Sequence, residues 1–162
     1  MLVVAPTARI SKLADVEDSV RGSRIVIEDE VMIDSFVRIK PVGGSGDVRI
    51  GRNSFINSGT VIFSGNGVDI GEWVLIAPNC TIAPVNHAYL KRDTTIRHQG
   101  FLPGKGGVRI ERDVWVGANS VLLDGAWLRE GCVIGAGSVV NGEVAPHTVN
   151  VGSPLRCIGQ RE

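Results

Sequence analysis

Large aliphatic residues recur at every sixth position over most of the chain. The downstream members of this column are Ile110, Val116, Leu122, Leu128, Ile134 and Val140. The same spacing occurs upstream in three blocks, formed by Ile27, Ile33 and Ile39, by Ile50, Ile56 and Ile62, and by Ile70, Ile76 and Ile82. A second column, four places after each downstream aliphatic, contains only small or β-branched residues: Val114, Ser120, Ala126, Cys132, Ser138 and Val144.

A six-residue period predicts strands, because it does not stay on one face of a helix with about 3.6 residues per turn. One aliphatic and one small residue per hexapeptide suit a narrow three-sided prism, with the aliphatic inside and the small residue near a corner. Three hexapeptides form a coil of about 18 residues, stacked by parallel strand pairing. Residues such as Gly51, Gly117 and Asn119 allow the tight turns. The sequence therefore predicts an all-β parallel β-solenoid.

The length of 162 residues fits a single domain, 1–162. Within it we expect hexapeptide coils over 27–151, an irregular N-terminal cap or a first coil over 1–26, and a C-terminal tail over 152–162. The interval from Ile82 to Ile110 is 28 residues, where the repeat requires six, so we expect one long loop at about residues 86–107. An insertion of this length in a regular fold is usually functional or an oligomer contact.

Charge and cysteine content exclude several classes of protein. The 17 basic and 17 acidic residues form no run of like charges, so the chain lacks the concentrated basic surface that nucleic-acid binding requires. No apolar run approaches the roughly 20 residues of a membrane span and the first residues lack the features of a signal peptide, so we expect a cytoplasmic protein. Cys80, Cys132 and Cys157 are too far apart for a metal motif, and no metal is expected.

His87 stands where the last coil segment before the loop, Ile82 to Asn86, passes into the loop itself. A neutral imidazole accepts a proton near pH 7, and a base is effective only when the scaffold holds it in place. His87 is therefore the candidate catalytic base. His98, deeper in the loop, and His147, near the end of the coils, are interpreted as surface residues.

Beyond the repeat itself, longer segments carry a resemblance to a known family. The segments are "GRNSFINSGTVIFSGNGVDIGEWVLIAPN", "VRIERDVWVGANSVLL", "GCVIGAGSVV" and "VGSPLRCIG", together with a long loop entered through a histidine. Over residues 27–159 the chain resembles the hexapeptide-repeat acyltransferases with a left-handed parallel β-helix. Within them it is most similar to the galactoside and maltose O-acetyltransferases and to the O-acetyltransferases of surface-polysaccharide synthesis, such as lipopolysaccharide biosynthesis.

The resemblance implies a homotrimer that binds acetyl-coenzyme A between neighbouring prisms and acetylates a hydroxyl of a sugar or polysaccharide precursor. His87 would take the proton from that hydroxyl as its oxygen attacks the thioester, with no acyl-enzyme intermediate. Gln99 stands where the sugar enzymes have a carboxylate that orients the histidine. It is a candidate orienter that offers a hydrogen bond but no negative charge. The candidate acceptor-binding residues are Asn57, which matches the family's asparagine, and the loop residues Asn86, Tyr89 and Arg92.

The resemblance also implies contacts with the coenzyme. Trp115 matches a tryptophan beside the pantetheine arm, although a packing role at a subunit contact is equally consistent with its position. Gly142 stands where relatives have a phosphate-binding lysine, and Arg156 is the candidate cation that compensates for it. Ala118 and Ala136 match positions whose backbone amides meet the pantetheine or the thioester, and Gly117 is a further candidate coenzyme-binding residue.

Two other functions stay open at this point. One is N-acetylation of a nucleotide-linked amino sugar, and the other is a non-catalytic hexapeptide scaffold. The γ-type carbonic anhydrases use the same solenoid, but their three-histidine zinc site does not fit the spacings of 11 and 49 residues between the histidines. The serine acetyltransferases carry a sizeable helical domain before the solenoid, for which the residues ahead of the coils are too few.

Overall fold

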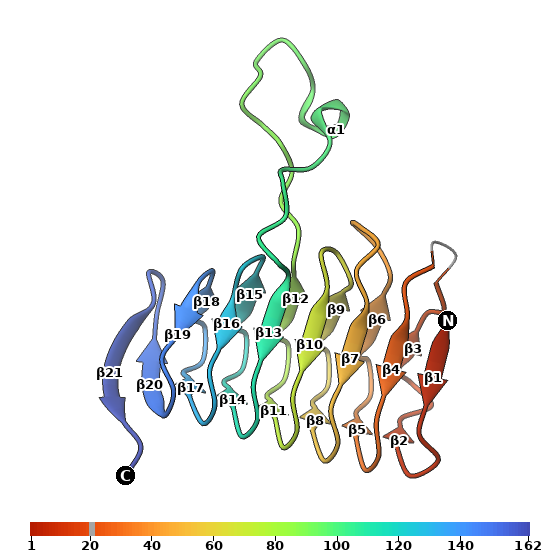
Figure 1. Ribbon diagram of the computed structural model, residues 1–162, viewed down its shortest axis with the longest axis vertical. Helices are drawn as coiled ribbons and strands as arrows, with labels where there is room; N and C mark the ends of the chain where they lie inside the picture. Colours follow the sequence, from red (N-terminus) through yellow and green to blue (C-terminus); the bar gives the residue numbers. More distant parts are fainter. Residues whose placement is uncertain (20–21) are drawn as a thin grey trace.

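The computed structural model describes residues 1–19 and 22–162, and it forms a prism of short strands wound around one axis (Figure 1). Sheet A contains β1 (Leu2–Val4), β4 (Ile25–Ile27), β7 (Val48–Ile50), β10 (Val68–Ile70), β13 (Val108–Ile110), β16 (Trp127–Leu128) and β19 (Glu143–Val144). Sheet B contains β2 (Arg9–Ile10), β5 (Met32–Ile33), β8 (Phe55–Ile56), β11 (Leu75–Ile76), β14 (Trp115–Val116), β17 (Val133–Ile134), β20 (Thr148–Val151) and β21 (Arg156–Gln160). Sheet C contains β3 (Asp15–Val16), β6 (Arg38–Lys40), β9 (Val61–Phe63), β12 (Thr81–Ala83), β15 (Val121–Leu123) and β18 (Val139–Val140).

Each coil contributes one strand to each sheet, and nearly all neighbouring strands pair in parallel. In sheet B, for example, Ile56, Ile76 and Val116 lie opposite one another on successive coils. The exception is β21, which pairs antiparallel with β20. The prediction of an all-β parallel solenoid is thus confirmed, with one helix of four residues, α1 (Ile96–Gln99), outside the prism. No helix in residues 1–19 and 22–162 is long and apolar enough to cross a membrane.

The aliphatic column forms the interior of the prism. Side chains alternate between inside and outside along each strand, so one large aliphatic per hexapeptide points to the axis. Full burial of such a side chain stabilises the fold by roughly 1.5–3 kcal/mol. The largest side chains that are fully buried are Ile25, Ile27, Ile39, Ile50, Ile56, Ile62, Ile70, Ile76, Ile82, Leu122, Leu128 and Ile134.

The corners require residues without a bulky side chain. We call the turn from sheet B to sheet C the BC corner, and the turn from sheet C to the next strand of sheet A the CA corner. At the BC corner after β14, Asn119 adopts a positive φ of 59°. A Cβ on Gly117 would lie 2.5 Å from the backbone nitrogen of Ala136 on the next coil. Glycine is therefore required there by the close approach of two coils.

Both ends of the chain continue the sheets. Strands β1, β2 and β3 pair with β4, β5 and β6 of the following coil, so the N-terminal residues form a coil. In the C-terminal segment, β21 folds back against β20 and ends sheet B. The two termini lie at opposite ends of the solenoid (Figure 1).

One long loop interrupts the prism at a CA corner. It occupies residues 84–107, between β12 and β13, and begins two residues earlier than the predicted range. In Figure 1 it projects well beyond the body of the solenoid on a narrow base and carries α1. The loop is the part of the fold that can reach a neighbouring molecule.

Candidate active site

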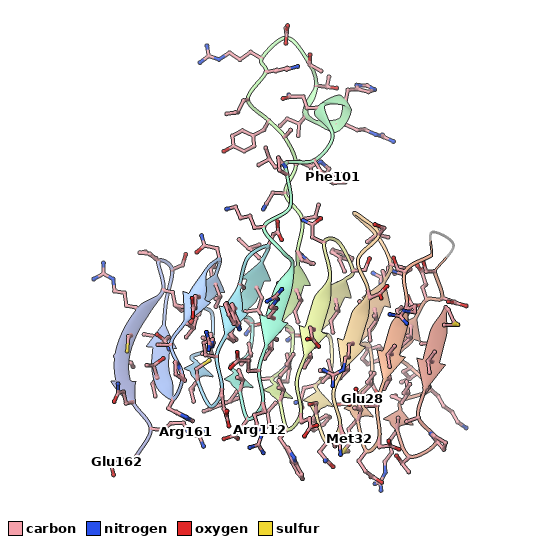
Figure 2. All side chains as sticks on the ribbon, viewed as in Figure 1. Glu28, Met32, Phe101, Arg112, Arg161 and Glu162 are labelled. Atoms are coloured by element: carbon pink, nitrogen blue, oxygen red, sulfur yellow. The ribbon has the colours of Figure 1, made fainter. Side chains whose placement is uncertain are left out.

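His87 lies in a short antiparallel stem at the base of the loop, where it faces Phe101 as an isolated β-bridge. The Ala88 amide donates to the Gly100 carbonyl at 3.0 Å, and the Leu102 amide donates to the Asn86 carbonyl at 2.8 Å. The rings of His87 and Phe101 are 4.7 Å apart between centroids, with 40° between their planes. Figure 2 shows Phe101 at the narrow base of the loop. The pairing of the two segments thus fixes the backbone of His87.

The imidazole of His87 is exposed to solvent. No hydrogen bond joins it to another side chain in the described ranges 1–19 and 22–162; its one side-chain interaction there is the stacking on Phe101. Both ring nitrogens are therefore accessible to a substrate. The other loop histidine differs, because His98 Nδ1 lies 2.6 Å from the Thr95 hydroxyl.

Gln99 does not contact His87, contrary to its expected role as an orienter. Its Oε1 accepts a hydrogen bond from the Lys91 amide at 3.0 Å, while Nε2 donates to the carbonyls of Lys91 and Thr94 at 2.9 and 2.8 Å. Both amide hydrogens are therefore used within the outer part of the loop. Gln99 braces the turn between Lys91 and α1, and the sequence could not show this because the partners are backbone groups.

The predicted acceptor-binding residues of the loop lie on both sides of His87. Asn86 belongs to the stem and is partly buried. Tyr89 follows the stem and is 62% exposed, and Arg92 is also exposed. These three side chains and His87 belong to the same loop.

The remaining predicted site residues lie on other edges of the prism. Asn57 follows β8 at the BC corner, where its Nδ2 donates to the Ile76 carbonyl at 2.8 Å. The loop of His87 follows β12 and lies at the CA corner. A single chain therefore does not bring Asn57 to His87. The BC corner also holds the three candidate coenzyme-binding residues Gly117, Ala118 and Ala136.

Trp115 and Gly142 lie on different parts of the prism. Trp115 is 52% exposed on the outer face of sheet B, between Leu75 and Val133 of adjacent coils. Gly142 lies at a CA corner, where its carbonyl accepts a hydrogen bond from the Trp127 amide at 3.1 Å. Arg156 is exposed at the start of β21. The structure thus distributes the predicted coenzyme residues over sheet B and two corners.

Sequence reasoning missed three residues near the base of the loop. Phe101 stacks on His87, and Asn66 and Asp124 hydrogen-bond each other at 3.0 Å beside the end of the loop. Asp124 is only 2% exposed. Asp124 had one signal in the sequence, since it is a charged residue directly after an aliphatic strand segment. Phe101 had no signal, because the pairing of the stem depends on the conformation of the whole loop.

The two buried thiols, Cys80 and Cys132, are poorly suited to nucleophilic chemistry. Burial raises the pKa of the Cys132 thiol to about 12 and also raises the pKa of the Cys80 thiol. Neither is suited to act as a thiolate nucleophile near neutral pH. Among residues 1–19 and 22–162, no group of three His, Cys, Asp or Glu side chains is placed to hold a metal ion.

A hollow of about 550 Å³ lies on sheet A near the CA corners, and it does not include His87. Its charged lining residues are Arg24, Asp47, Arg49, Asp69 and Arg109. Two of the arginines are paired with acids, Arg24 with Asp47 and Arg49 with Asp69. The hollow is therefore a separate, largely neutralised surface feature, and His87 itself stands open to solvent.

Comparisons with known proteins agree with this description. The family model for the bacterial transferase hexapeptide (six repeats) matches residues 107–142. The galactoside O-acetyltransferase of Escherichia coli is 34% identical over 116 residues, which cover 69% of this chain and 53% of that enzyme.

Two groups of solved structures are similar over longer stretches. A hexapeptide-repeat acetyltransferase of Vibrio cholerae, complexed with acetyl-coenzyme A, is 28% identical with a TM-score of 0.71, covering 82% of this chain and 69% of that one. A mutant of AntD, an N-acyltransferase of Bacillus cereus, in complex with dTDP-4-amino-4,6-dideoxyglucose and coenzyme A, is 25% identical with a TM-score of 0.82. That match covers 99% of this chain and 84% of AntD.

The chain belongs to the hexapeptide-repeat acyltransferase family, and its prism is the left-handed parallel β-helix of that family. It spans between 38% and 54% of the length of the first curated relatives that it matches.

Proposed function

We propose that this protein transfers an acetyl group from acetyl-coenzyme A to a hydroxyl of a sugar or polysaccharide precursor, with His87 as the general base. The observation that carries the proposal is an exposed imidazole, fixed on a hydrogen-bonded stem at the base of the loop, in a chain of the acyltransferase family. A base held in this way needs little reorganisation when a substrate binds.

In the proposed reaction His87 takes a proton from the acceptor hydroxyl and later gives it to the sulfur of coenzyme A. One nitrogen of His87 accepts the proton of the acceptor hydroxyl while its oxygen attacks the thioester carbonyl. The carbon–sulfur bond then breaks, and the imidazolium returns the proton to the sulfur of the departing coenzyme A. The backbone amide of Ala118 at a BC corner is the proposed donor to the oxyanion, since the Gly117 amide already donates to the Ile134 carbonyl at 2.7 Å. The buried thiols take no part, in keeping with direct transfer.

Stacking on Phe101 takes the place of a carboxylate in holding the imidazole. The two rings are in contact, and the hydrogen bonds on both sides of the bridge restrict their backbones. Since Gln99 is engaged with Lys91 and Thr94, orientation of His87 rests on this stem. Within the described part of one chain, no carboxylate forms a hydrogen bond or an ion pair with the proposed base.

A second copy of the chain is needed to complete the site. The loop with His87 and the BC corner with Asn57 and Gly117 lie on different edges of the prism. The outer face of sheet B also presents an apolar row, in register over five coils, whereas outward charges on sheet A pair with one another. The row consists of Met32, Phe55, Leu75, Trp115 and Val133. We propose a homotrimer in which the loop of one protomer faces the BC corner of its neighbour.

N-acylation of a nucleotide-linked amino sugar is the second candidate function. It is favoured by the likeness to AntD, whose complex contains a dTDP-linked amino sugar and which covers nearly the whole of this chain. The galactoside O-acetyltransferase of Escherichia coli, at higher identity, favours the hydroxyl.

Release of coenzyme A thiol from acetyl-coenzyme A distinguishes these functions. The assay should use galactosides, nucleotide-linked hexoses and dTDP-4-amino-4,6-dideoxyglucose as acceptors, with the acetylated product identified by mass. We expect turnover with at least one hydroxyl acceptor. Transfer to the amino sugar alone would support the N-acyltransferase. Binding of acetyl-coenzyme A without transfer to any acceptor would leave the non-catalytic hexapeptide scaffold as the remaining function.

Mixed oligomers test whether the site lies between protomers. When His87→Ala and Asn57→Ala chains are unfolded and refolded together in equal amounts, one interface in four pairs an intact loop with an intact BC corner. We therefore expect about a quarter of the wild-type rate, although each variant alone is nearly inactive. Mixing His87→Ala with His87→Asn is the matched control and should recover nothing. A mixture no more active than its parents would place the site within one chain.

A further inference from the structure

Asp124 is a buried carboxylate at the CA corner after β15, one coil beyond the loop. It is 2% exposed, and among the described residues it forms no ion pair. Its Oδ2 accepts hydrogen bonds from Asn66 Nδ2 at 3.0 Å and from the Lys105 amide at 2.8 Å, and its Oδ1 accepts one from the Gly107 amide at 2.9 Å. Three N–H groups thus surround a carboxylate that forms no ion pair within residues 1–19 and 22–162.

A carboxylate in such a place is costly unless its oxygens are hydrogen-bonded. Hydrogen bonds from N–H groups to a charged oxygen are about twice as strong as those between neutral groups. Two of the three donors here are backbone amides at the end of the loop, Lys105 and Gly107. The stability of the buried charge and the conformation of this end of the loop therefore depend on each other.

The third donor connects the same carboxylate to the start of the loop. Asn66 lies at the CA corner after β9, and its backbone amide donates to the Pro84 carbonyl at 3.0 Å. Its side chain also packs so closely against the chain at Gly104 that a Cβ there would lie 2.8 Å from Asn66 Cγ. The Asn66–Asp124 pair thus holds both ends of the loop against the prism.

These two ends lead directly into the stem that carries His87. Pro84 is three residues before His87, and Lys105 is four residues after Phe101. The stem's hydrogen bonds join the two segments, so displacement of either end moves the imidazole with it. Figure 1 shows that the loop meets the prism only at this narrow base between β12 and β13.

We propose that Asp124 is a positioning residue for the transfer reaction, which holds the loop so that His87 stays at reactive distance from the acceptor. The proposal rests on the proposed function of His87. Asp124 acts through the backbone of the loop and does not itself touch the substrate. Asn66 is its partner.

Asp124→Asn tests this role because it keeps the size of the side chain and removes the charge. An amide group at this site points its NH₂ at one or more of the three N–H donors. We expect kcat to fall by about 10- to 100-fold, as a displacement of roughly 1 Å can produce, with the KM for acetyl-coenzyme A changed by less than about twofold. Amide hydrogen exchange should become faster in residues 84–107 and stay unchanged in the coils.

Asp47→Asn is the matched control. Asp47 also lies at a CA corner and accepts hydrogen bonds from the amide and Nε of Arg24, but it contacts no loop residue. It should leave kcat and the exchange of residues 84–107 unchanged. Asn66→Ala keeps the two hydrogen bonds from backbone amides to Asp124 and should lower kcat less than Asp124→Asn does. This second variant keeps the proposal testable if Asp124→Asn fails to fold.

Two results would overturn the proposal. One is that Asp124→Asn has the same kcat as Asp47→Asn. If Asp124→Asn does not fold, the same comparison is made with Asn66→Ala. The other is a loss of activity with unchanged exchange in the loop. Failure of the proposed function is distinguishable, because a wild-type protein that transfers no acetyl group gives no kcat to compare. Exchange in the variants then shows separately whether the pair holds the loop.

Discussion

Replacing His87 with alanine is expected to lower kcat for acetyl transfer by about 10²- to 10⁴-fold, the usual contribution of a general base. The imidazole has no hydrogen-bond partner in the described chain, so the substitution removes a proton acceptor and the ring contact with Phe101. The KM for acetyl-coenzyme A should stay within about twofold of the wild-type value, since the interaction that is lost is made in the transition state. Release of coenzyme A thiol at several acceptor concentrations measures both constants.

Three further variants separate loss of the base from loosening of the stem. His87→Gln keeps a polar side chain of similar reach without a basic nitrogen, and it should lose as much activity as His87→Ala. His98→Ala removes the other loop histidine, which is bonded to Thr95, and should keep the wild-type kcat. Phe101→Leu keeps the base and should have an intermediate effect. Unchanged turnover of His87→Ala would disprove the assignment of the base.

Truncating the interior column should have the largest effect on stability. Leu122 lies in β15 between Ile82 and Val140 of the adjacent coils and is 0% exposed. Leu122→Ala leaves a cavity that the narrow prism closes poorly, because neighbouring coils are held in register by backbone hydrogen bonds. We expect a loss of about 2–5 kcal/mol in the free energy of unfolding, measured by guanidinium denaturation at fixed protein concentration.

Leu13→Ala provides the same chemical change outside the prism. Leu13 is 60% exposed in the turn before β3, so its truncation removes little packed surface. The free energy of unfolding should change by no more than about 0.5 kcal/mol. Equal losses for the two variants would mean that the aliphatic column does not form the stabilising core.

The solenoid could be predicted because its signal is local and repeated. Each hexapeptide places one aliphatic inside and one small residue near a corner, so the pattern in residues 27–144 specifies both the strands and their stacking. The long loop was predicted for the same reason, as a gap in the repeat. The prediction missed its first two residues, since Pro84 and Val85 carry no feature that separates them from a coil.

The candidate site was only partly accessible to sequence reasoning. His87 was predicted as the base because it stands at the break in the repeat, and this assignment stays a prediction. The hydrogen bonds of Gln99 could not be predicted, because its amide binds backbone groups of Lys91 and Thr94 that have no sequence signature. Phe101 and Asp124 were missed, since their contacts join segments that come together only when the loop folds back on the prism.

The sequence by itself determined the period of the fold, the residues that face its axis and the position of the one excursion. These depend on side-chain size and on spacing along the chain, which folding does not alter. Only the tertiary structure decided which groups surround His87, and that Asn57 and the loop lie on different edges of the prism. The reason is physical: contacts between the loop and the prism depend on how the loop closes, and the hexapeptide pattern encodes neither loop closure nor the hydrogen bonds within the loop.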